Sequence, residues 1–214
     1  MIMNRIKSPY TATITGCAFL YPEFMRVLPL LMAPNSDELL KEEAINNQFL
    51  QVNSQKARKT FINEFKRRYQ AVPAKFWHQM QTYSEQGQKT ALLYAILKTY
   101  RLLFDFHFDV TIKQWNSIER TLQKNDIMME FNEISAHDAF VDGWTELTKN
   151  KCASQYLTIL RQVGMLDEKT NELRPLHLQE ASEYEYYIRS GEEWFLEACL
   201  LYPYEINDIK ANLS

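Results

Sequence analysis

The stretch KTALLYAILKTYRLLFDFHF, residues 89–108, is apolar on almost every side when it is drawn as a helix. A surface helix keeps one polar face, whereas a helix that is apolar all round is buried. Glycine is scarce, with 5 residues among 214, and 46% of the residues are hydrophobic. These features predict a mainly α-helical globular protein built around a central buried helix.

On the N-terminal side of this stretch, residues 34–70 predict two helices joined by a short polar turn. Ser36 and Ser54 are residue types that cap helix N-termini. A short helix, a turn and a longer basic helix follow each other in a helix-turn-helix, and also in a plain helical hairpin. We predict an N-terminal helix-turn-helix-like unit at residues 1–75 and a central helical core at residues 76–134.

On the C-terminal side, TELTKNKCASQYLTILRQV, residues 145–163, predicts a helix that ends at Gly164. The segment LDEKTNELRPLHL, residues 166–178, predicts two short strands around a polar turn. A helix followed by a glycine and a hairpin is the order found in winged-helix proteins. We therefore predict a winged-helix-like unit with a short β-hairpin wing at residues 135–214, which also contains an acidic C-terminal helix.

The formal net charge of −3 conceals an uneven distribution of charge. Residues 1–70 carry ten basic and six acidic side chains, whereas residues 121–214 carry eight basic and seventeen acidic ones. Within the basic part, NSQKARKTFINEFKRRYQ, residues 53–70, holds six cations and one acid, Glu64. Such a local excess of positive charge points to an anionic partner.

A helical wheel of residues 53–70 separates an apolar side from a basic side, with Glu64 at the flank. A merely solvated face usually mixes signs, because opposite charges four residues apart stabilise a helix. The segregation favours nucleic acid as the partner, with a solvated face as the alternative. Four such phosphate contacts predict a slope of log K against log salt of roughly −3.6. The candidate phosphate contacts are Lys56, Lys59, Lys66 and Arg67, and the candidate contacts to bases or sugars are Thr60 and Asn63.

The helix at residues 145–163 offers a second candidate surface, although its outward side chains would suit any exposed helix. Polar side chains of these types can reach base edges or phosphates. The predicted wing adds two cations that could lie along the DNA backbone. These candidates are Lys151, Ser154, Gln155, Thr158 and Arg161 on the helix, and Lys169 and Arg174 in the wing.

The sequence contains no GxSxG, HExxH or Gly-rich phosphate-loop motif, so we predict no catalytic residue and no cofactor. The three cysteines, Cys17, Cys152 and Cys199, are widely spaced, and each of the four histidines stands alone. Neither pattern is typical of a metal site or of a disulfide framework. The apolar runs are interrupted by charges before they reach the ~20 residues that a membrane span needs. We therefore expect a soluble, cytoplasmic protein with no membrane contact.

The segment EASEYEYYIRSGEEWFLEACLL, residues 180–201, is both acidic and aromatic. One interpretation is a terminal helix that packs Trp194 and Phe195 onto the core. The other is a docking face for a protein, with aromatic anchors. The candidate anchors are Tyr184, Tyr186 and Tyr187.

Three further stretches resemble the BrxA family of BREX bacteriophage-resistance systems. They are YTATITGCAFLYPEFMRVLPLL at residues 10–31, K-x-Y-R-L-L-x-D-F-H at Lys98–His107 and L-x-x-x-G-M-L at Leu160–Leu166. The resemblance spans residues 10–200 and rests on apolar framework positions. It implies a helical protein with helix-turn-helix and winged-helix character that binds double-stranded DNA. Such a protein would work beside larger BREX components such as a methyltransferase, an ATPase and a phosphatase-like protein.

These observations together favour a non-enzymatic double-stranded DNA-binding accessory protein of a BREX phage-defence system. Two alternatives stay open. The protein could be a protein–protein interaction module whose basic helix meets an acidic surface of a BREX partner. It could also bind RNA, because the BrxA family is sometimes likened to RNA-binding antitermination factors. The oligomeric state is left open, since no heptad seam is present.

Overall fold

The computed structural model of the chain describes residues 8–213, and it confirms a mainly α-helical fold. In chain order the elements are η1 (a 3₁₀-helix, Thr13–Gly16), α1 (Tyr21–Met32), α2 (Ser36–Asn46), α3 (Gln55–Gln70), α4 (Ala74–Met80), α5 (Glu85–Thr99), α6 (Arg101–Asp105), η2 (a π-helix, Phe106–Thr111), α7 (Ile112–Trp115), α8 (Lys124–His137), α9 (Ala139–Asp142), α10 (Glu146–Val163), α11 (Ala181–Arg189), α12 (Trp194–Ala198) and α13 (Pro203–Leu213).

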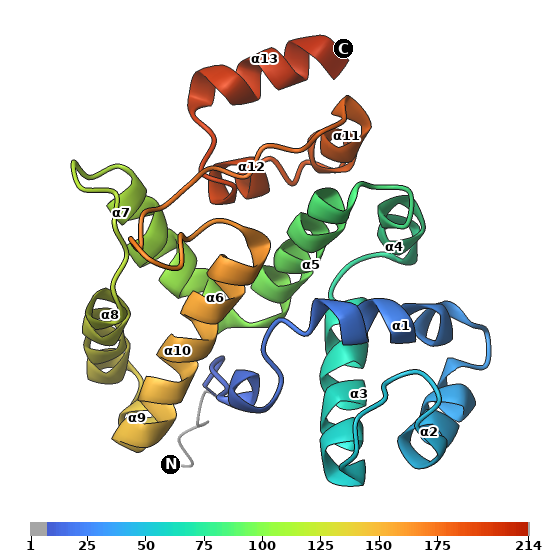
Figure 1. Cartoon of the computed structure of the whole chain (residues 1–214). Helices are drawn as coiled ribbons and strands as arrows, with labels where there is room; N and C mark the ends of the chain where they lie inside the picture. Colours follow the sequence, from blue (N-terminus) through green and yellow to red (C-terminus); the bar gives the residue numbers. More distant parts are fainter. Residues whose placement is uncertain (1–7, 214) are drawn as a thin grey trace, which may run out of the picture.

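Helix α5 runs through the middle of the molecule (Figure 1). Helices α1–α4 lie on one side of it, α6–α10 lie on the other, and α11–α13 lie across one end. One continuous cluster of buried apolar side chains extends from Ile14 in η1 to Ile206 in α13 and joins these parts. The division into units at residues 1–75, 76–134 and 135–214 stays a prediction.

The central stretch is buried as predicted, but it is not a single helix. Every residue from Thr90 to Leu97 in α5 is buried. The helix ends at Thr99, and Tyr100 has extended backbone angles of φ −117° and ψ 102° before α6 and η2 begin. With this break, the Tyr100 hydroxyl reaches α3 and donates to the Glu64 carboxylate at 2.7 Å. The break in the apolar stretch at Tyr100 therefore coincides with a buried hydrogen bond from Tyr100 to the neighbouring helix α3.

The predicted β-hairpin wing at residues 166–178 is wrong. Within residues 8–213, β-pairing is limited to isolated bridges, Leu166 with Leu173 and Thr121 with Glu172. The polar turn between Leu166 and Leu173 closes on the Asp167 side chain, which accepts two backbone N–H bonds at 2.9 Å. Pairing stops at Pro175, which has no N–H to donate. The next residue, Leu176, instead donates to the carbonyl of Cys199 at 2.9 Å.

Helices α2 and α3 follow each other in the predicted order, with residues 47–54 as the connection. Ser54 caps α3 as expected, because its Oγ accepts the Ala57 N–H at 3.3 Å. The Ser36 cap is wrong by one residue: Asn35 occupies the N-cap position of α2 and makes no side-chain cap bond. The connection is irregular, with Asn47 and Gln51 at positive φ.

Two buried charged side chains hold this connection in place. The Glu43 carboxylate at the end of α2 accepts the N–H groups of Gln48, Phe49 and Leu50 at 2.8–3.2 Å. The Arg58 guanidinium of α3 donates to the carbonyls of Ala44, Ile45, Val52 and Asn53 at 2.7–3.3 Å. Buried backbone groups need such partners, so these two side chains hold the end of α2 and the connection against α3.

The acidic aromatic segment at residues 180–201 packs into the core. Tyr184, Tyr186 and Tyr187 are buried together with Phe195, and Trp194 is half-buried. The three tyrosines are therefore not exposed anchors for a protein partner. No helix within residues 8–213 combines the length and the apolar character that spanning a bilayer requires.

Candidate nucleic-acid interface

The six cations of α3 divide into two that are buried and four that reach the surface. Arg58 and Arg68 are buried. Arg68 donates to the carbonyls of Cys17 at 2.6 Å and of Phe19 at 2.9 Å, and to that of Ala18. These carbonyls lie in the segment between η1 and α1. Both arginines therefore hold backbone in place and are unavailable to an external ligand.

Arg67 reaches the surface but has an internal acid partner. The sequence analysis placed Glu64 at the flank of α3, but this residue is buried. Its carboxylate lies 3.1 Å from the Arg67 Nη1. Arg67 also donates to the Thr13 hydroxyl of η1 at 3.0 Å, and Glu64 accepts from Tyr100. The ion pair and the Tyr100 contact explain why an acid is tolerated inside, since a buried carboxylate needs charged or hydrogen-bonding partners.

Lys66 is likewise engaged. Its Nζ lies 2.5 Å from the Asp37 carboxylate of α2. The hydrogen bond and the charge of Lys66 lower the pKa of Asp37 below its ordinary value. Both groups are solvent-accessible, so the pair contributes little to stability. The Asp37 carboxylate largely neutralises the Lys66 charge, so less of this charge is available to an external ligand.

The positive charge that an external ligand can reach lies in the N-terminal half of α3. Lys56 and Lys59 are exposed, and neither has an ion-pair partner among the described residues. Asn63 is exposed next to them, and Thr60 is half-buried with its hydroxyl bonded to the Lys56 carbonyl at 3.0 Å. Lys56 and Lys59 are therefore basic residues without acids beside them, as the helical wheel indicated. Lys66 and Arg67 instead lie next to acids.

Helix α10 directs its side chains largely as the sequence predicts. Its apolar side is buried, from Cys152 to Val163. Lys151 and Ser154 are exposed, while Gln155 and Thr158 are half-buried. The Thr158 hydroxyl donates to the Ser154 carbonyl at 2.9 Å, so it is partly satisfied within the helix.

Three other cations of this region are held by protein groups. Arg161 donates to the Asn171 side chain at 2.8 Å, and Arg174 lies 2.8 Å from the Asp167 carboxylate. Lys149, which the sequence analysis did not single out, is buried and donates to the Ser135 hydroxyl at 3.0 Å. Lys169 is exposed at the turn that follows α10, far along the chain from Lys151. The candidate set is therefore split between the two ends of α10.

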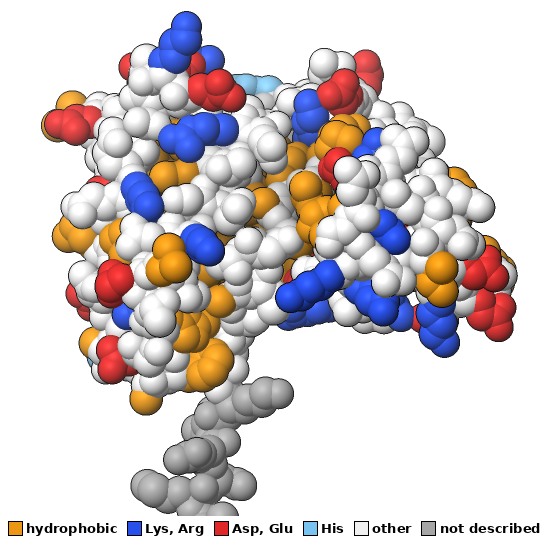
Figure 2. Space-filling model, turned by 60° about the horizontal axis from the view of Figure 1, so that its bottom comes forward, with side chains coloured by type: hydrophobic (Ala, Val, Ile, Leu, Met, Phe, Trp, Pro, Cys, Tyr) orange, Lys and Arg blue, Asp and Glu red, His pale blue; other side chains and the backbone are white. Residues whose placement is uncertain are grey.

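The N-terminal ends of α3 and α10 lie on the same side of the molecule (Figure 1). Between them lies η1, which contacts both helices. Figure 2, in which this side is turned forward, shows basic side chains on both lobes and a hollow between the lobes. Lys56 and Lys59 belong to the N-terminal half of α3 and Lys151 to that of α10, whereas Lys169 and Arg174 belong to the turn at the other end of α10.

The buried His107 belongs to a neutral hydrogen-bond chain behind α10. Burial lowers the pKa of His107 to about 4, so the ring is neutral at pH 7. Its Nε2–H donates to the Ala198 carbonyl at 2.7 Å, so Nδ1 accepts from the Tyr156 hydroxyl at 2.9 Å. The Thr111 hydroxyl completes the chain, 2.6 Å from the Tyr156 oxygen. The chain joins η2, α10 and α12 and is closed to ligands.

The described residues offer little support for a metal site or for a nucleophilic cysteine. Within residues 8–213, no group of three or more His, Cys, Asp or Glu side chains is placed to hold a metal ion. Cys17, Cys152 and Cys199 are buried and unpaired, and burial raises the pKa of each thiol. Protonated, enclosed thiols are poor nucleophiles.

Sequence reasoning missed the inward arginines, although a signal for them was present. Arg58 precedes Ile62 by four residues and Phe65 by seven, and Arg68 follows Phe65 by three. These spacings place both arginines on the apolar side of the helix. Glu43 carried no comparable signal, because its role depends on the path of the following connection.

The fold defines a small, mainly helical protein in which α3 and α10 carry exposed lysines. The chain belongs to the BrxA family: the family model described as BrxA matches residues 8–189. This confirms the resemblance found in the sequence.

The known proteins to which the chain is similar include the following two. "BREX protein BrxA" of Bacillus cereus (strain H3081.97) is 26% identical over 157 residues, which cover 73% of this chain and 78% of the relative. The crystal structure of an uncharacterized protein from Magnetospirillum magneticum superposes with a TM-score of 0.75 at 23% identity. It covers 90% of this chain and 98% of its own, and it shares the fold.

Proposed function

We propose that this protein binds double-stranded DNA as a non-enzymatic accessory component of a BREX phage-defence system. Membership of the BrxA family supports the role in phage defence, since the Bacillus cereus relative is named a BREX protein. Other BREX components are then its expected protein partners. The observation that supports the DNA proposal is that α3 and α10 have their N-terminal ends on the same side of the molecule and carry exposed lysines in their N-terminal halves.

In this proposal Lys56, Lys59 and Lys151 neutralise phosphates, because they have no ion-pair partner among the described residues. Asn63 and Ser154 are exposed beside them and would reach base edges or sugars. The remaining candidates on the two helices are Thr60, Gln155, Thr158, Arg161, Lys66 and Arg67, and in the turn Lys169 and Arg174. These contribute less, since most are engaged within the protein or lie away from this side.

The proposal fixes a salt dependence. Three phosphate contacts predict a slope of log K against log salt of about −2.7, shallower than the roughly −3.6 of four contacts. Binding of this kind is modest and largely independent of sequence, because phosphate contacts carry no sequence information.

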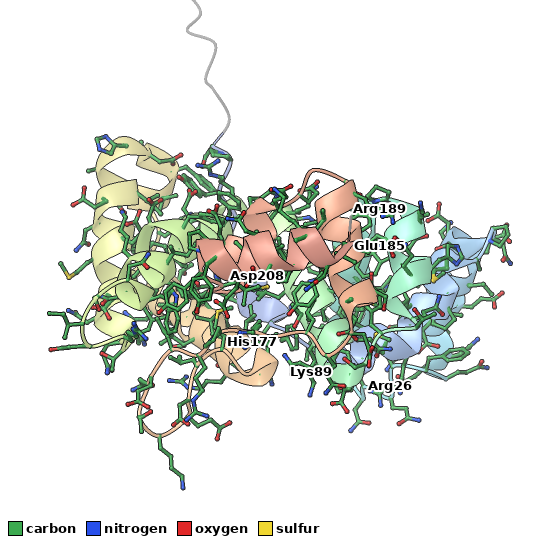
Figure 3. The ribbon with its side chains drawn as sticks, turned by 90° about the horizontal axis from the view of Figure 1, so that it is seen from above. Arg26, Lys89, His177, Glu185, Arg189 and Asp208 are labelled. Atoms are coloured by element: carbon green, nitrogen blue, oxygen red, sulfur yellow. The ribbon has the colours of Figure 1, made fainter. Side chains whose placement is uncertain are left out.

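Fluorescence anisotropy with a labelled duplex at several salt concentrations tests the proposal. Replacing Lys56 and Lys59 by Gln should reduce the magnitude of the slope by about 1.8. The matched control replaces Lys113 and Arg189 by Gln; each forms an exposed i,i+4 ion pair, with Asp109 and Glu185 respectively. Figure 3 shows Arg189 and Glu185 together on the end of the molecule opposite the basic side. The control should bind like the unaltered protein.

Single-stranded DNA and RNA of the same sequence complete the experiment. Stronger binding to RNA or to single strands than to the duplex would replace the proposal by an RNA or single-strand function. Equal weakening by the control pair would mean that net charge, and not this surface, governs binding. No duplex binding at low salt would refute the proposal.

A further inference from the structure

Helices α2 and α3 enclose an open cleft of about 570 Å³. Residues spaced three or four apart on each helix form its two walls, so the walls run along the helix axes. The lining residues are Asp37, Leu40, Lys41, Ala44 and Ile45 of α2, and Gln55, Lys59, Ile62, Asn63 and Lys66 of α3. A volume of this size falls within the range of ligand-binding clefts.

The floor of the cleft is apolar. Leu40, Ala44 and Ile62 are buried beneath it, and Ile45 stands at the wall with 66% of its surface exposed. Exposed isoleucines are few among residues 8–213, and here one adjoins further apolar surface. A continuous apolar strip beside polar residues is typical of a protein-interaction surface.

The rims of the cleft are basic. Lys41 and Lys59 line it from opposite helices, and neither forms an ion pair within residues 8–213. The one acid in the lining, Asp37, is already paired with Lys66. The residues that line the cleft therefore carry a net positive charge, which favours an occupant with acidic groups on both of its flanks.

We propose that this cleft binds an acidic amphipathic helix of a protein partner. An elongated apolar strip between two helices accepts the apolar side of a third helix by ridge-into-groove packing. Acidic side chains on either flank of that helix would then meet Lys41 and Lys59. A DNA duplex presents charge but no apolar ridge, so it would leave the surface around Ile45 without a partner.

This interaction goes beyond the proposed DNA binding and has a consequence for it. Lys59, Asn63 and Lys66 belong both to the cleft and to the candidate DNA surface. The partner helix and the duplex therefore compete for α3, whereas Leu40, Lys41, Ala44 and Ile45 serve the partner alone.

The test uses the full chain and a stapled helical peptide of about 16 residues, a length at which a helix is no longer marginal. The peptide carries Leu at positions i, i+3, i+4 and i+7 and Glu on both flanks of this stripe. A second peptide replaces each Glu by Lys, and a third replaces each Leu by Ala. Anisotropy measures binding of each to the unaltered protein and to the Ile45→Ser and Lys41→Glu variants.

The matched control is Ile118→Ser, because Ile118 is fully exposed in the connection between α7 and α8. Only the Glu–Leu peptide should bind, and Ile45→Ser should weaken it about tenfold, as expected for loss of an apolar anchor. Lys41→Glu should weaken it as well, and Ile118→Ser should leave it unchanged. Duplex binding should be unaffected by Ile45→Ser.

Three results would overturn the proposal: no binding of the Glu–Leu peptide, equal binding of the Lys peptide, or insensitivity to Ile45→Ser. A loss of duplex binding in Ile45→Ser that matches the loss of peptide binding would assign the cleft to DNA instead. Because duplex and peptide are measured separately, failure of this proposal is distinguishable from failure of the DNA proposal.

Discussion

Helices α3 and α10 bury polar side chains in opposite ways. Helix α3 buries the charged side chains of Arg58, Glu64 and Arg68, which bind backbone carbonyls, Arg67 and Tyr100. Helix α10 is bonded mainly through the neutral Tyr156, which contacts His107 and Thr111. Of the six cations of α3, two are therefore buried, and Lys66 and Arg67 are paired with acids of the protein. A count of lysines and arginines does not measure the charge that a ligand can reach.

The largest effect that this comparison predicts is at Arg68. Arg68→Met should lower the free energy of unfolding by about 3–5 kcal/mol, because it leaves the carbonyls of residues 17–19 without a donor in the core. Urea denaturation measures the change. Lys56→Met on the outer side of α3 is the control and should change stability by less than about 0.5 kcal/mol. A loss below about 1 kcal/mol for Arg68→Met would mean that the arginine is not needed to hold the segment.

The second prediction concerns pH and the neutral contacts of α10. The pKa of His107 is about 4 in the folded protein, whereas an unperturbed histidine has a pKa of 6.5. Between pH 4 and 6.5 the imidazole is therefore protonated in the unfolded chain and neutral in the folded protein, so acid favours unfolding. The contribution of neutral His107 to the free energy of unfolding is complete above pH 6.5 and is lost as the pH falls toward 4. It amounts to about 3 kcal/mol.

Urea denaturation across pH 4–7 measures it, with His107→Gln as the comparison, which should show a flatter dependence on pH. The same pH dependence in both proteins would assign the acid sensitivity to other groups.

A third prediction contrasts two buried cations. Lys149 of α10 donates to one hydroxyl, that of Ser135, whereas Arg68 of α3 serves several carbonyls. Lys149→Met should therefore cost less than about 1 kcal/mol in unfolding free energy, since Ser135 is half-buried and its hydroxyl can reach water. Thermal or urea denaturation beside Arg68→Met gives the comparison directly. Equal losses would contradict the distinction between the helices.

The smallest effect tests whether internal pairing withholds charge from a ligand. Asp37→Asn releases Lys66 from its ion pair. The released lysine should make the slope of log K against log salt for duplex DNA steeper by about 0.9. Anisotropy measures the slope, and Glu85→Gln, which releases Lys89 of α5 in the same way, is the control. An unchanged slope in Asp37→Asn would place Lys66 outside the DNA contact.

Sequence reasoning predicted the elements better than their charged contacts. The burial of residues 90–97 and the inward side of α10 followed from apolar spacing alone. The break at Tyr100 and the inward turn of Glu64 did not, because each depends on the other across different helices. The strands expected at residues 166–178 failed because Asp167 and Pro175 favour a turn over a ladder. Local pattern predicts which side of a helix is buried, and pairing across helices decides which charges stay outside.

The contact between Arg68 and residues 17–19 has a mechanical consequence. Arg68 ties α3 to the segment that continues from η1, and η1 contacts α10. Helices α3 and α10 are therefore connected to each other through η1 and this segment, and the connection sets the distance between them. A bivalent ligand with a rigid spacer gains avidity when its target matches the span, and loses it when the target does not. In the proposed complex, a duplex that contacts both helices would have to match this distance by bending, so flexible DNA should be held more tightly than stiff DNA.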